Sequence, residues 1–162
     1  MIIIKIWFHI ISTLKKIFYK IYGSKLSTGK HTTWRRNFLI MIANEGKVSI
    51  GDNCFFNNDC TIGANKFIEI GEGTIFGENV KIYDHNHKFA DLKRSIKEQG
   101  FSNGTVSIGR HCWIGSNVCI LKNADIGDNC VIGAGCVISG KIEDNTIVKI
   151  DSQTQYLTES LR

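Results

Sequence analysis

Aliphatic residues recur at every sixth position through much of this chain. From Ile108 the sequence reads IGRHCW, IGSNVC, ILKNAD, IGDNCV, IGAGCV and ISGKIE. A weaker copy starts as IGDNCF at Ile50, slips by two residues after the unit beginning at Ile62, and resumes at Ile70. A period of six would scatter these side chains around an α-helix, whose period is 3.6 residues, so the repeat excludes helix here.

Most repeat units carry Gly directly after the aliphatic residue. Gly weakens a strand interior and favours a bend. We therefore predict a solenoid in which each hexapeptide forms one short strand and one corner, and the aliphatic residues of stacked coils form an axial core. Because such a prism has a thin core, we also expect it to associate with neighbouring copies.

Most of the six cysteines occupy the fifth position of a repeat unit, which is reserved for small residues. Cys behaves there as a small buried hydrophobe, and the spacings contain no CxxC pair of the kind that binds zinc or undergoes redox chemistry. The sequence therefore predicts structural, reduced thiols, a cytoplasmic protein, and no metal site.

Positive charge is concentrated at the N-terminus. The net charge is +5, from 20 Lys and Arg against 15 Asp and Glu, yet residues 1–36 hold eight of the bases and none of the acids. The rest of the chain is mildly acidic. Since the bases are not interleaved with exposed aromatics along a groove and no nucleic-acid-binding motif is present, we expect no nucleic acid partner.

Residues 1–22 have the periodicity of a basic amphipathic helix. Polar residues recur at spacings of three and four, and the apolar run is interrupted at Lys5 and His9, so it is too short to span a bilayer. Two interpretations remain open: peripheral binding to the inner face of the cell membrane, or packing of the apolar face on the coils or on neighbouring subunits.

The six-residue register disappears between Ile82 and Val106. Long irregular segments in compact domains are usually functional or disordered, and this one begins with Asp84, His85 and His87. Histidine suits proton transfer near neutral pH. The residues alone leave two interpretations, an active-site loop or a polar surface loop with two solvated histidines.

The repeat, above all the stretch from CWIGS at 112–116 through IGDNCVIGAGCVI, resembles the hexapeptide-repeat acyltransferases, and the DHNH motif is similar to that of polysaccharide O-acetyltransferases. The resemblance covers about residues 48 to 150. It implies a left-handed parallel β-helix and a homotrimer with active sites between subunits. It also implies acetyl-CoA as co-substrate and a sugar hydroxyl, in a cell-surface polysaccharide or its precursor, as acceptor.

By the same resemblance, a histidine of the loop is the general base in a direct acetyl transfer. A gapless alignment from Asn79 places it on His87, which we favour, and His85 is the competing candidate. Asn57 and Asp84 are the expected acceptor-side residues. The expected acetyl-CoA contacts are Trp113, Ser116, Ala134, Ser139 and Lys141, although Gly140 interrupts the family's pattern at the last pair.

One family element is missing, since the chain contains no Pro. Relatives close the last coil with Pro-Ala and a basic residue near the 3′-phosphate of CoA, so Lys141 or Lys149 would have to supply that charge. This leaves room for a second function class, a non-catalytic β-helical scaffold recruited to the membrane. A carbonic anhydrase of similar architecture is disfavoured, because the histidines lack the spacing of its metal ligands.

The expected organisation is therefore a helix over 1–22, a linker over 23–33, and an all-β solenoid over 34–155. A loop at 83–105 leaves the coils, and residues 156–162 form a tail.

Overall fold

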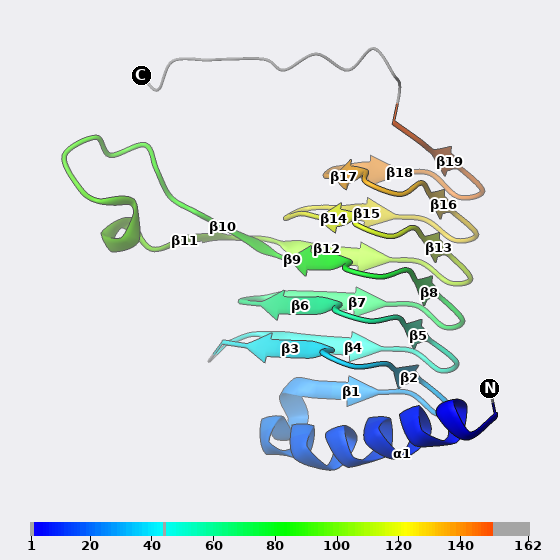
Figure 1. The fold of residues 1–162 in the computed structure, drawn as a ribbon. Coiled ribbons are helices and arrows are strands. Elements are labelled where there is room, and N and C mark those ends of the chain that lie inside the picture. The colour runs from blue at the N-terminus through cyan, green and yellow to red at the C-terminus, as the bar shows by residue number, and fades with distance from the viewer. Residues whose placement is uncertain (1, 44, 151–162) are drawn as a thin grey trace.

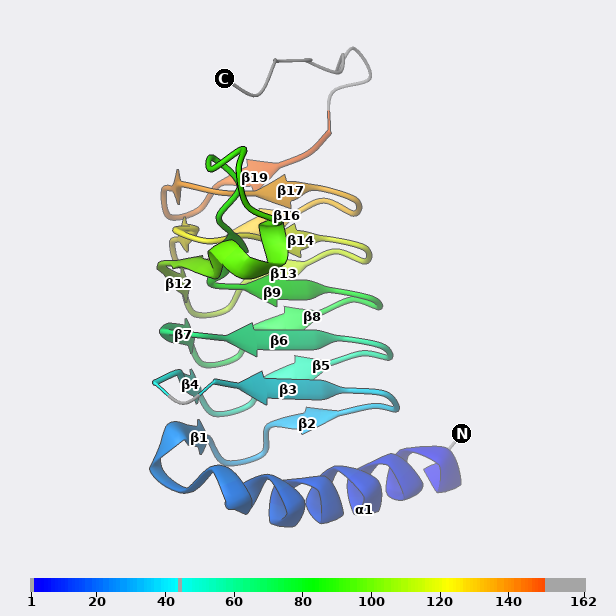
Figure 2. The same cartoon turned by 90° about the vertical axis from the view of Figure 1, so that its left-hand side faces the viewer.

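The computed structural model describes residues 2–43 and 45–150, and it confirms a parallel β-solenoid of about six turns with one N-terminal helix (Figure 1). The coils rise in the left-handed sense in Figures 1 and 2. Each complete coil has three short strands, one on each of three parallel sheets.

The three sheets form the sides of a prism. The first sheet consists of β1 (Leu26–Thr28), β4 (Lys47–Ile50), β7 (Phe67–Ile70), β12 (Thr105–Ile108), β15 (Asp125–Ile126) and β18 (Lys141–Ile142). The second consists of β2 (Thr33–Trp34), β5 (Phe55–Phe56), β8 (Ile75–Phe76), β13 (Trp113–Ile114), β16 (Val131–Ile132) and β19 (Ile147–Val148). The third consists of β3 (Leu39–Ile42), β6 (Thr61–Ala64), β9 (Lys81–Tyr83), β14 (Cys119–Ile120) and β17 (Val137–Ile138).

The strands pair so that equivalent repeat positions stack. Ile114 of β13 pairs with Phe76 below it and Ile132 above it, and all three side chains are buried. Near the N-terminal end the same interior is aromatic, with the Phe56 and Phe76 rings stacked at a centroid distance of 4.4 Å. The aliphatic positions of the repeat therefore form the predicted axial core.

The corners differ in one respect from the expectation. The glycine after the aliphatic residue was expected to provide the bend, but the left-handed backbone lies two positions later, for example at Asn53 and Asn129, both with φ of 57°. Asn tolerates this conformation better than most residues. The glycine is needed because coils approach closely: a Cβ on Gly115 would lie 2.6 Å from the backbone N of Ala134.

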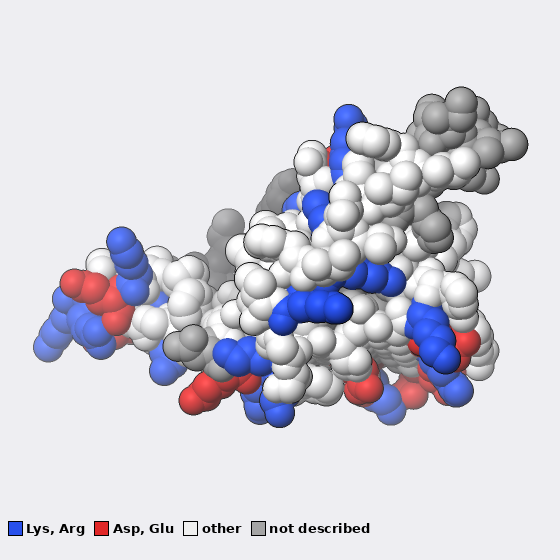
Figure 3. Space-filling model, turned by 90° about the horizontal axis from the view of Figure 1, so that it is seen from below, with Lys and Arg blue, Asp and Glu red and all other residues white. Residues whose placement is uncertain are grey.

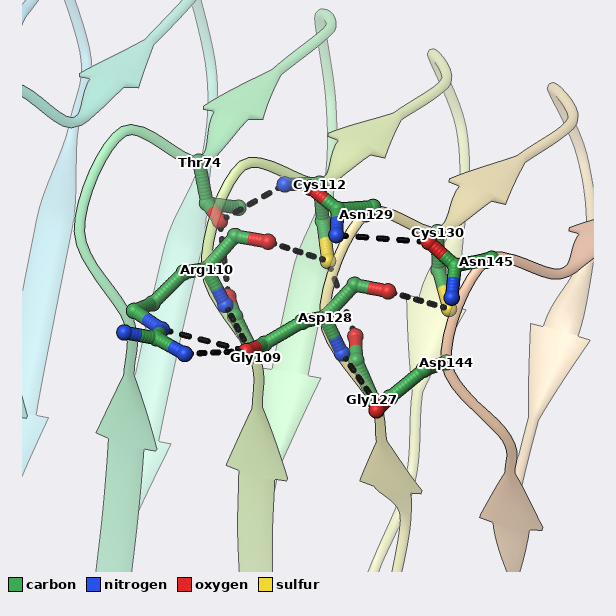
Figure 4. Close-up of polar contacts among 10 residues, drawn as sticks. All are labelled: Thr74, Gly109, Arg110, Cys112, Gly127, Asp128, Asn129, Cys130, Asp144 and Asn145. Carbon is green, nitrogen blue, oxygen red and sulfur yellow. Dashed lines mark hydrogen bonds and ion pairs between the residues drawn. The ribbon is translucent and has the colours of Figure 1, made fainter.

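The corner cysteines are structural, as predicted. The Cys112 thiol donates to the carbonyl of Gly127 and the Cys130 thiol to that of Glu143, each at 3.1 Å (Figure 4 shows both cysteines and the adjoining asparagine ladder). Burial raises the pKa of Cys54, Cys60 and Cys112. Because a nucleophilic cysteine needs a lowered pKa, these three are poorly suited to carry an acyl group.

The N-terminal helix closes one end of the prism. The helix α1 (Ile2–Tyr19) lies across the first coil, and the 3-10 turn η1 (Lys20–Lys25) connects α1 to the first strand of that coil (Figure 2). The predicted linker at 23–33 is shorter than expected, since β1 at Leu26–Thr28 already pairs with β4. Alternating exposure in such a short strand gives little signal in the sequence. The predicted tail at 156–162 lies outside the described residues.

Candidate active site

A hairpin leaves the prism where the repeat breaks. The strand β10 (His85–His87) pairs antiparallel with β11 (Phe101–Asn103), and the 3-10 turn η2 (Ile96–Gln99) lies near the tip. The hairpin projects from the corner between β9 and β12 and extends away from the coils (Figure 1). The segment expected as an irregular loop is thus held together at its base by a short two-stranded pairing.

Asp84 anchors the base of this hairpin. Its side chain is fully buried, and its two carboxylate oxygens accept hydrogen bonds from the backbone N–H groups of Asn65 at 2.8 Å and Lys66 at 2.7 Å. Its own carbonyl accepts from the N–H of Gly104 at 2.7 Å, where the chain returns to the prism. Asp84 therefore fixes both the exit and the return of the hairpin.

This burial changes the role expected for Asp84. The sequence placed Asp84 among the acceptor-contacting residues, but a side chain with no exposed surface does not reach an acceptor from solvent. The partners of Asp84 lie at the two-residue slip of the repeat, where the chain between β6 and β7 is lengthened by Asn65 and Lys66. The slip is the sequence signal for this contact, because the two extra residues add backbone N–H groups that donate to Asp84 and not to a carbonyl of a neighbouring coil.

His85 is oriented by the same carboxylate. The His85 Nδ1 lies 3.0 Å from the Asp84 Oδ1. An ionised carboxylate only accepts hydrogen bonds, so this contact places the imidazole proton on Nδ1 and leaves Nε2 with a free lone pair. The side chain of His85 is 20% exposed and packs edge-on against Phe101 at a centroid distance of 5.1 Å. The ring is thus held on two sides while one side stays accessible.

A hollow of about 360 Å³ adjoins His85. It is lined by His85, Tyr83, Tyr22 and Asn65 and by small or apolar residues of β3 and β6. A Cβ on Gly63 would lie 2.8 Å from the Tyr83 ring, so a larger residue there would displace that ring, while the His85 Cε1 at 3.6 Å would be in ordinary contact. Gly63, Tyr83 and Phe101 were not foreseen as supports of the site, since no motif marks them.

His87 has a different setting one step further along β10. Its ring is exposed and lies over Phe101 at a centroid distance of 4.5 Å. It borders a second hollow of about 500 Å³ on the hairpin, together with Lys88, Arg94 and Lys122. Within the described part of the chain no carboxylate holds this imidazole, so its tautomer is not fixed in the way that of His85 is.

The residues expected to contact acetyl-CoA lie in two other regions of the prism. Trp113 is 56% exposed on β13 and is flanked in its sheet by Ile75 and Val131. Ser116 and Ala134 follow β13 and β16 at one corner, where the Ser116 hydroxyl accepts from the N–H of Glu78 at 3.1 Å. Asn57 lies at that corner two coils below Ser116, and its Oδ1 accepts from Arg35 at 3.1 Å.

Ser139 and Lys141 lie instead on the corner that carries the hairpin, nearer to the C-terminal end. The exposed Lys141 ammonium is 2.9 Å from Glu143, and this carboxylate raises the pKa of Lys141. Within one copy, then, Asp84 and His85 meet, and Asn57, Trp113, Ser116 and Ala134 form a separate group. The two groups lie at different corners of the prism.

Comparison with known proteins identifies the family. Residues 105–140 match the model described as bacterial transferase hexapeptide (six repeats). A maltose O-acetyltransferase structure from Clostridium difficile 630 is 31% identical, with a TM-score of 0.61, over 80% of this chain and 67% of that one. The chain therefore belongs to the hexapeptide-repeat acetyltransferases.

Two further relatives add detail. A putative lipopolysaccharide biosynthesis O-acetyl transferase from Escherichia coli K12 is 32% identical over 64% of this chain and 56% of its own length. A hexapeptide-repeat acetyltransferase from Vibrio cholerae, solved in complex with acetyl-CoA, shares the fold with 20% identity and a TM-score of 0.68, over 83% of this chain and 71% of that one. The chain spans between 35% and 56% of the length of the curated relatives it matches.

Proposed function

We propose that this chain is an acetyl-CoA-dependent O-acetyltransferase that modifies a sugar hydroxyl of a cell-surface polysaccharide or its precursor. The observation that carries the proposal is the pair formed by the buried Asp84 carboxylate and the half-buried His85 ring, 3.0 Å apart. Membership of the family and the names of the sugar-modifying relatives support the choice of a sugar acceptor. The proposed location is the cytoplasm.

In this mechanism His85 is the general base. Its Nε2 takes the proton from the sugar hydroxyl as the hydroxyl oxygen attacks the thioester carbonyl carbon. Backbone N–H groups of a coil stabilise the resulting oxyanion. Collapse breaks the carbon–sulfur bond, and the proton held on His85 passes to the leaving thiolate, so the base is restored. Asp84 keeps Nδ1 protonated throughout and stabilises the imidazolium.

The prism surface fits an extended thioester substrate in part. The small side chains of Ser116 and Ala134 leave a smooth corner beside the exposed Trp113 ring, as a pantetheine arm requires. The positive charge expected near the 3′-phosphate is partly neutralised, because the Lys141 ammonium pairs with the Glu143 carboxylate. Since Asn57 and Trp113 lie away from the hairpin, we propose a homotrimer in which His85 of one subunit faces the Trp113 corner of the next.

The test compares two histidine variants in acetyl-CoA turnover with a panel of sugar acceptors. A positioned general base contributes about 100- to 10,000-fold, so His85→Ala is expected to lower kcat by at least about 100-fold. His87→Ala is the matched control and should keep kcat within several-fold. Mass spectrometry of the acceptor establishes whether an O-acetyl ester has formed.

The reverse pattern, with activity lost in His87→Ala and kept in His85→Ala, would assign the base to His87 as the gapless alignment suggests. Failure of the wild-type chain to acetylate any acceptor in the panel would favour the non-catalytic scaffold.

A further inference from the structure

The helix α1 is mounted with its apolar side facing outward. Toward the coil it presents Ser12, whose Oγ accepts from the Trp34 N–H, Lys15, which donates to the Phe38 carbonyl at 3.0 Å, and the buried Tyr19. The opposite side exposes a row of large apolar residues that continues into η1 at Ile21. This apolar stripe consists of Ile6, Trp7, Ile10, Leu14, Ile17, Phe18 and Ile21.

The apolar stripe is unusual for a helix that covers a core. Helices normally bury their apolar face against the protein, and contiguous exposed patches of this kind mark interaction sites. Here Leu14 is 61% exposed, Phe18 63% and Ile21 69%. Because α1 lies below the first coil in both ribbon views, its free side points along the prism axis, away from the coils (Figures 1 and 2).

Cations accompany the apolar stripe. Residues 1–36 contain eight Lys or Arg and no acid. A hollow of about 500 Å³ beside the helix is lined by Lys16 and Lys20 together with Tyr19, Gly23 and Trp34. Seen from below, Lys and Arg side chains cross the middle of this end, whereas the visible acidic side chains lie at its edges (Figure 3).

We propose that the apolar stripe docks this end of the prism onto an anionic lipid bilayer, with α1 lying in the plane of the interface. An amphipathic helix with lysines beside Trp and Phe is suited to the boundary between headgroups and acyl chains. The helix is not long and apolar enough to cross a membrane, nor is any other helix in the described ranges.

Charge favours a bilayer over a second copy of this chain as the occupant. Two copies packed end to end would bring their lysine-bearing ends together without an acidic partner from residues 1–36, which costs free energy by like-charge repulsion. Anionic headgroups supply the missing negative charge. Lys and Arg side chains near such a surface are attracted to it, and added salt weakens that attraction.

Docking in this orientation leaves the candidate active site open. The hairpin leaves the prism sideways from the third coil, while α1 lies under the first (Figure 1). A coil spacing of about 4.8 Å and a helix diameter of about 10 Å put His85 on the order of 20 Å above the bilayer surface. An acceptor presented from the same membrane would meet the site from the side.

The experiment is co-sedimentation of the full chain with vesicles of phosphatidylcholine alone or mixed with phosphatidylglycerol. We expect binding to the mixed vesicles, weakened by added salt. Replacing Ile10, Leu14 and Ile17 by Ser should lower binding at least tenfold. The matched control carries the same replacement by Ser at Leu92 and Ile96, which are exposed apolar residues of the hairpin. It should bind as the wild type does.

Charge reversal at Lys20 (Lys20→Glu) should weaken binding to the mixed vesicles, and Lys93→Glu on the hairpin is its control. Circular dichroism establishes that each variant is folded. The proposal is overturned if the wild type co-sediments with neither type of vesicle, or if the triple variant binds as tightly as the wild type. It is also overturned if sedimentation velocity shows that the apolar stripe holds two assemblies together. None of these readouts depends on catalysis, so the outcome is separate from that of the histidine test.

Discussion

At the scale of single residues, the site depends on one buried carboxylate that serves structure and chemistry together. Asp84 accepts hydrogen bonds from two backbone N–H groups in the corner between β6 and β7, and it also faces the His85 Nδ1. Buried acceptors of this kind are costly to leave unmatched. Asp84 is therefore a positioning residue, since it acts on the reaction through His85 and does not touch the acceptor.

The substitution Asp84→Asn should separate these two roles. An amide has a single acceptor oxygen, so one of the Asn65, Lys66 and His85 contacts is lost, and the tautomer of His85 is no longer fixed. We expect kcat to fall by about 10- to 1000-fold with the KM for acetyl-CoA nearly unchanged, and stability to fall by about 1–3 kcal/mol.

Steady-state kinetics and urea unfolding measure these effects, with Asp91→Asn on the exposed part of the hairpin as control. A variant that loses stability but keeps its kcat would show that Asp84 has only a structural role.

At the scale of elements, α1 closes the open end of the solenoid. Among the described residues no coil lies beneath the first one, and the Tyr19 ring occupies that place. It packs edge-on against Trp34, and its hydroxyl reaches the Phe38 backbone. Its hydroxyl donates to the Phe38 carbonyl at 3.1 Å and accepts from the Ile40 N–H at 3.2 Å. Burial raises the pKa of Tyr19, which keeps this phenol protonated and able to donate. Capping of this kind is what terminal coils of repeat proteins require.

Removing the Tyr19 hydroxyl should therefore destabilise the fold. In Tyr19→Phe the buried Ile40 N–H loses its acceptor, whereas the Phe38 carbonyl keeps Lys15 as a donor. The expected cost is about 1–3 kcal/mol in the free energy of unfolding.

Urea denaturation at fixed protein concentration measures it. Tyr22→Phe is the matched control, because the Tyr22 hydroxyl only donates to the Ile40 carbonyl and its loss should cost about 0.5–1.5 kcal/mol. Equal stability of the two variants would mean that α1 does not cap the coil through Tyr19.

At the scale of the whole molecule, the candidate residues lie on different parts of one prism. The hairpin leaves the corner between β9 and β12, while Ser116 and Ala134 follow β13 and β16. Under the proposed function, the first group supplies the general base and the second the expected acetyl-CoA contacts. The proposed trimer brings the two groups together, because threefold packing of identical prisms brings one corner of each against a different corner of the next.

Mixing two inactive variants tests this arrangement. Subunits with His85→Ala and subunits with Trp113→Ala are co-expressed with different tags and purified through both. Every mixed trimer then contains one site with both groups intact, so activity at limiting acetyl-CoA should recover to about one third of the wild-type value per trimer. Activity no higher than that of the separate variants would exclude a site shared between subunits.

Much of the fold follows from the sequence because its determinants are local. The aliphatic residue, the glycine and the small fifth residue repeat in each coil, and each coil meets only its neighbours, so six residues of pattern specify one side of the prism. The break in the repeat likewise located the hairpin. The corner asparagines are a local signal too, visible in the sequence at Asn53 and Asn129 but not recognised from it.

The site and the outward face of α1 were decided by contacts between distant parts of the chain. Asp84 and His85 are adjacent in sequence, but only the fold brings the Asn65 and Lys66 amides to that carboxylate and leaves His87 exposed on the hairpin. The amphipathic pattern of residues 1–22 similarly fixed the existence of two helix faces. Which face met the coil depended on the hydrogen-bonding needs of the open first coil, which Ser12, Lys15 and Tyr19 satisfy.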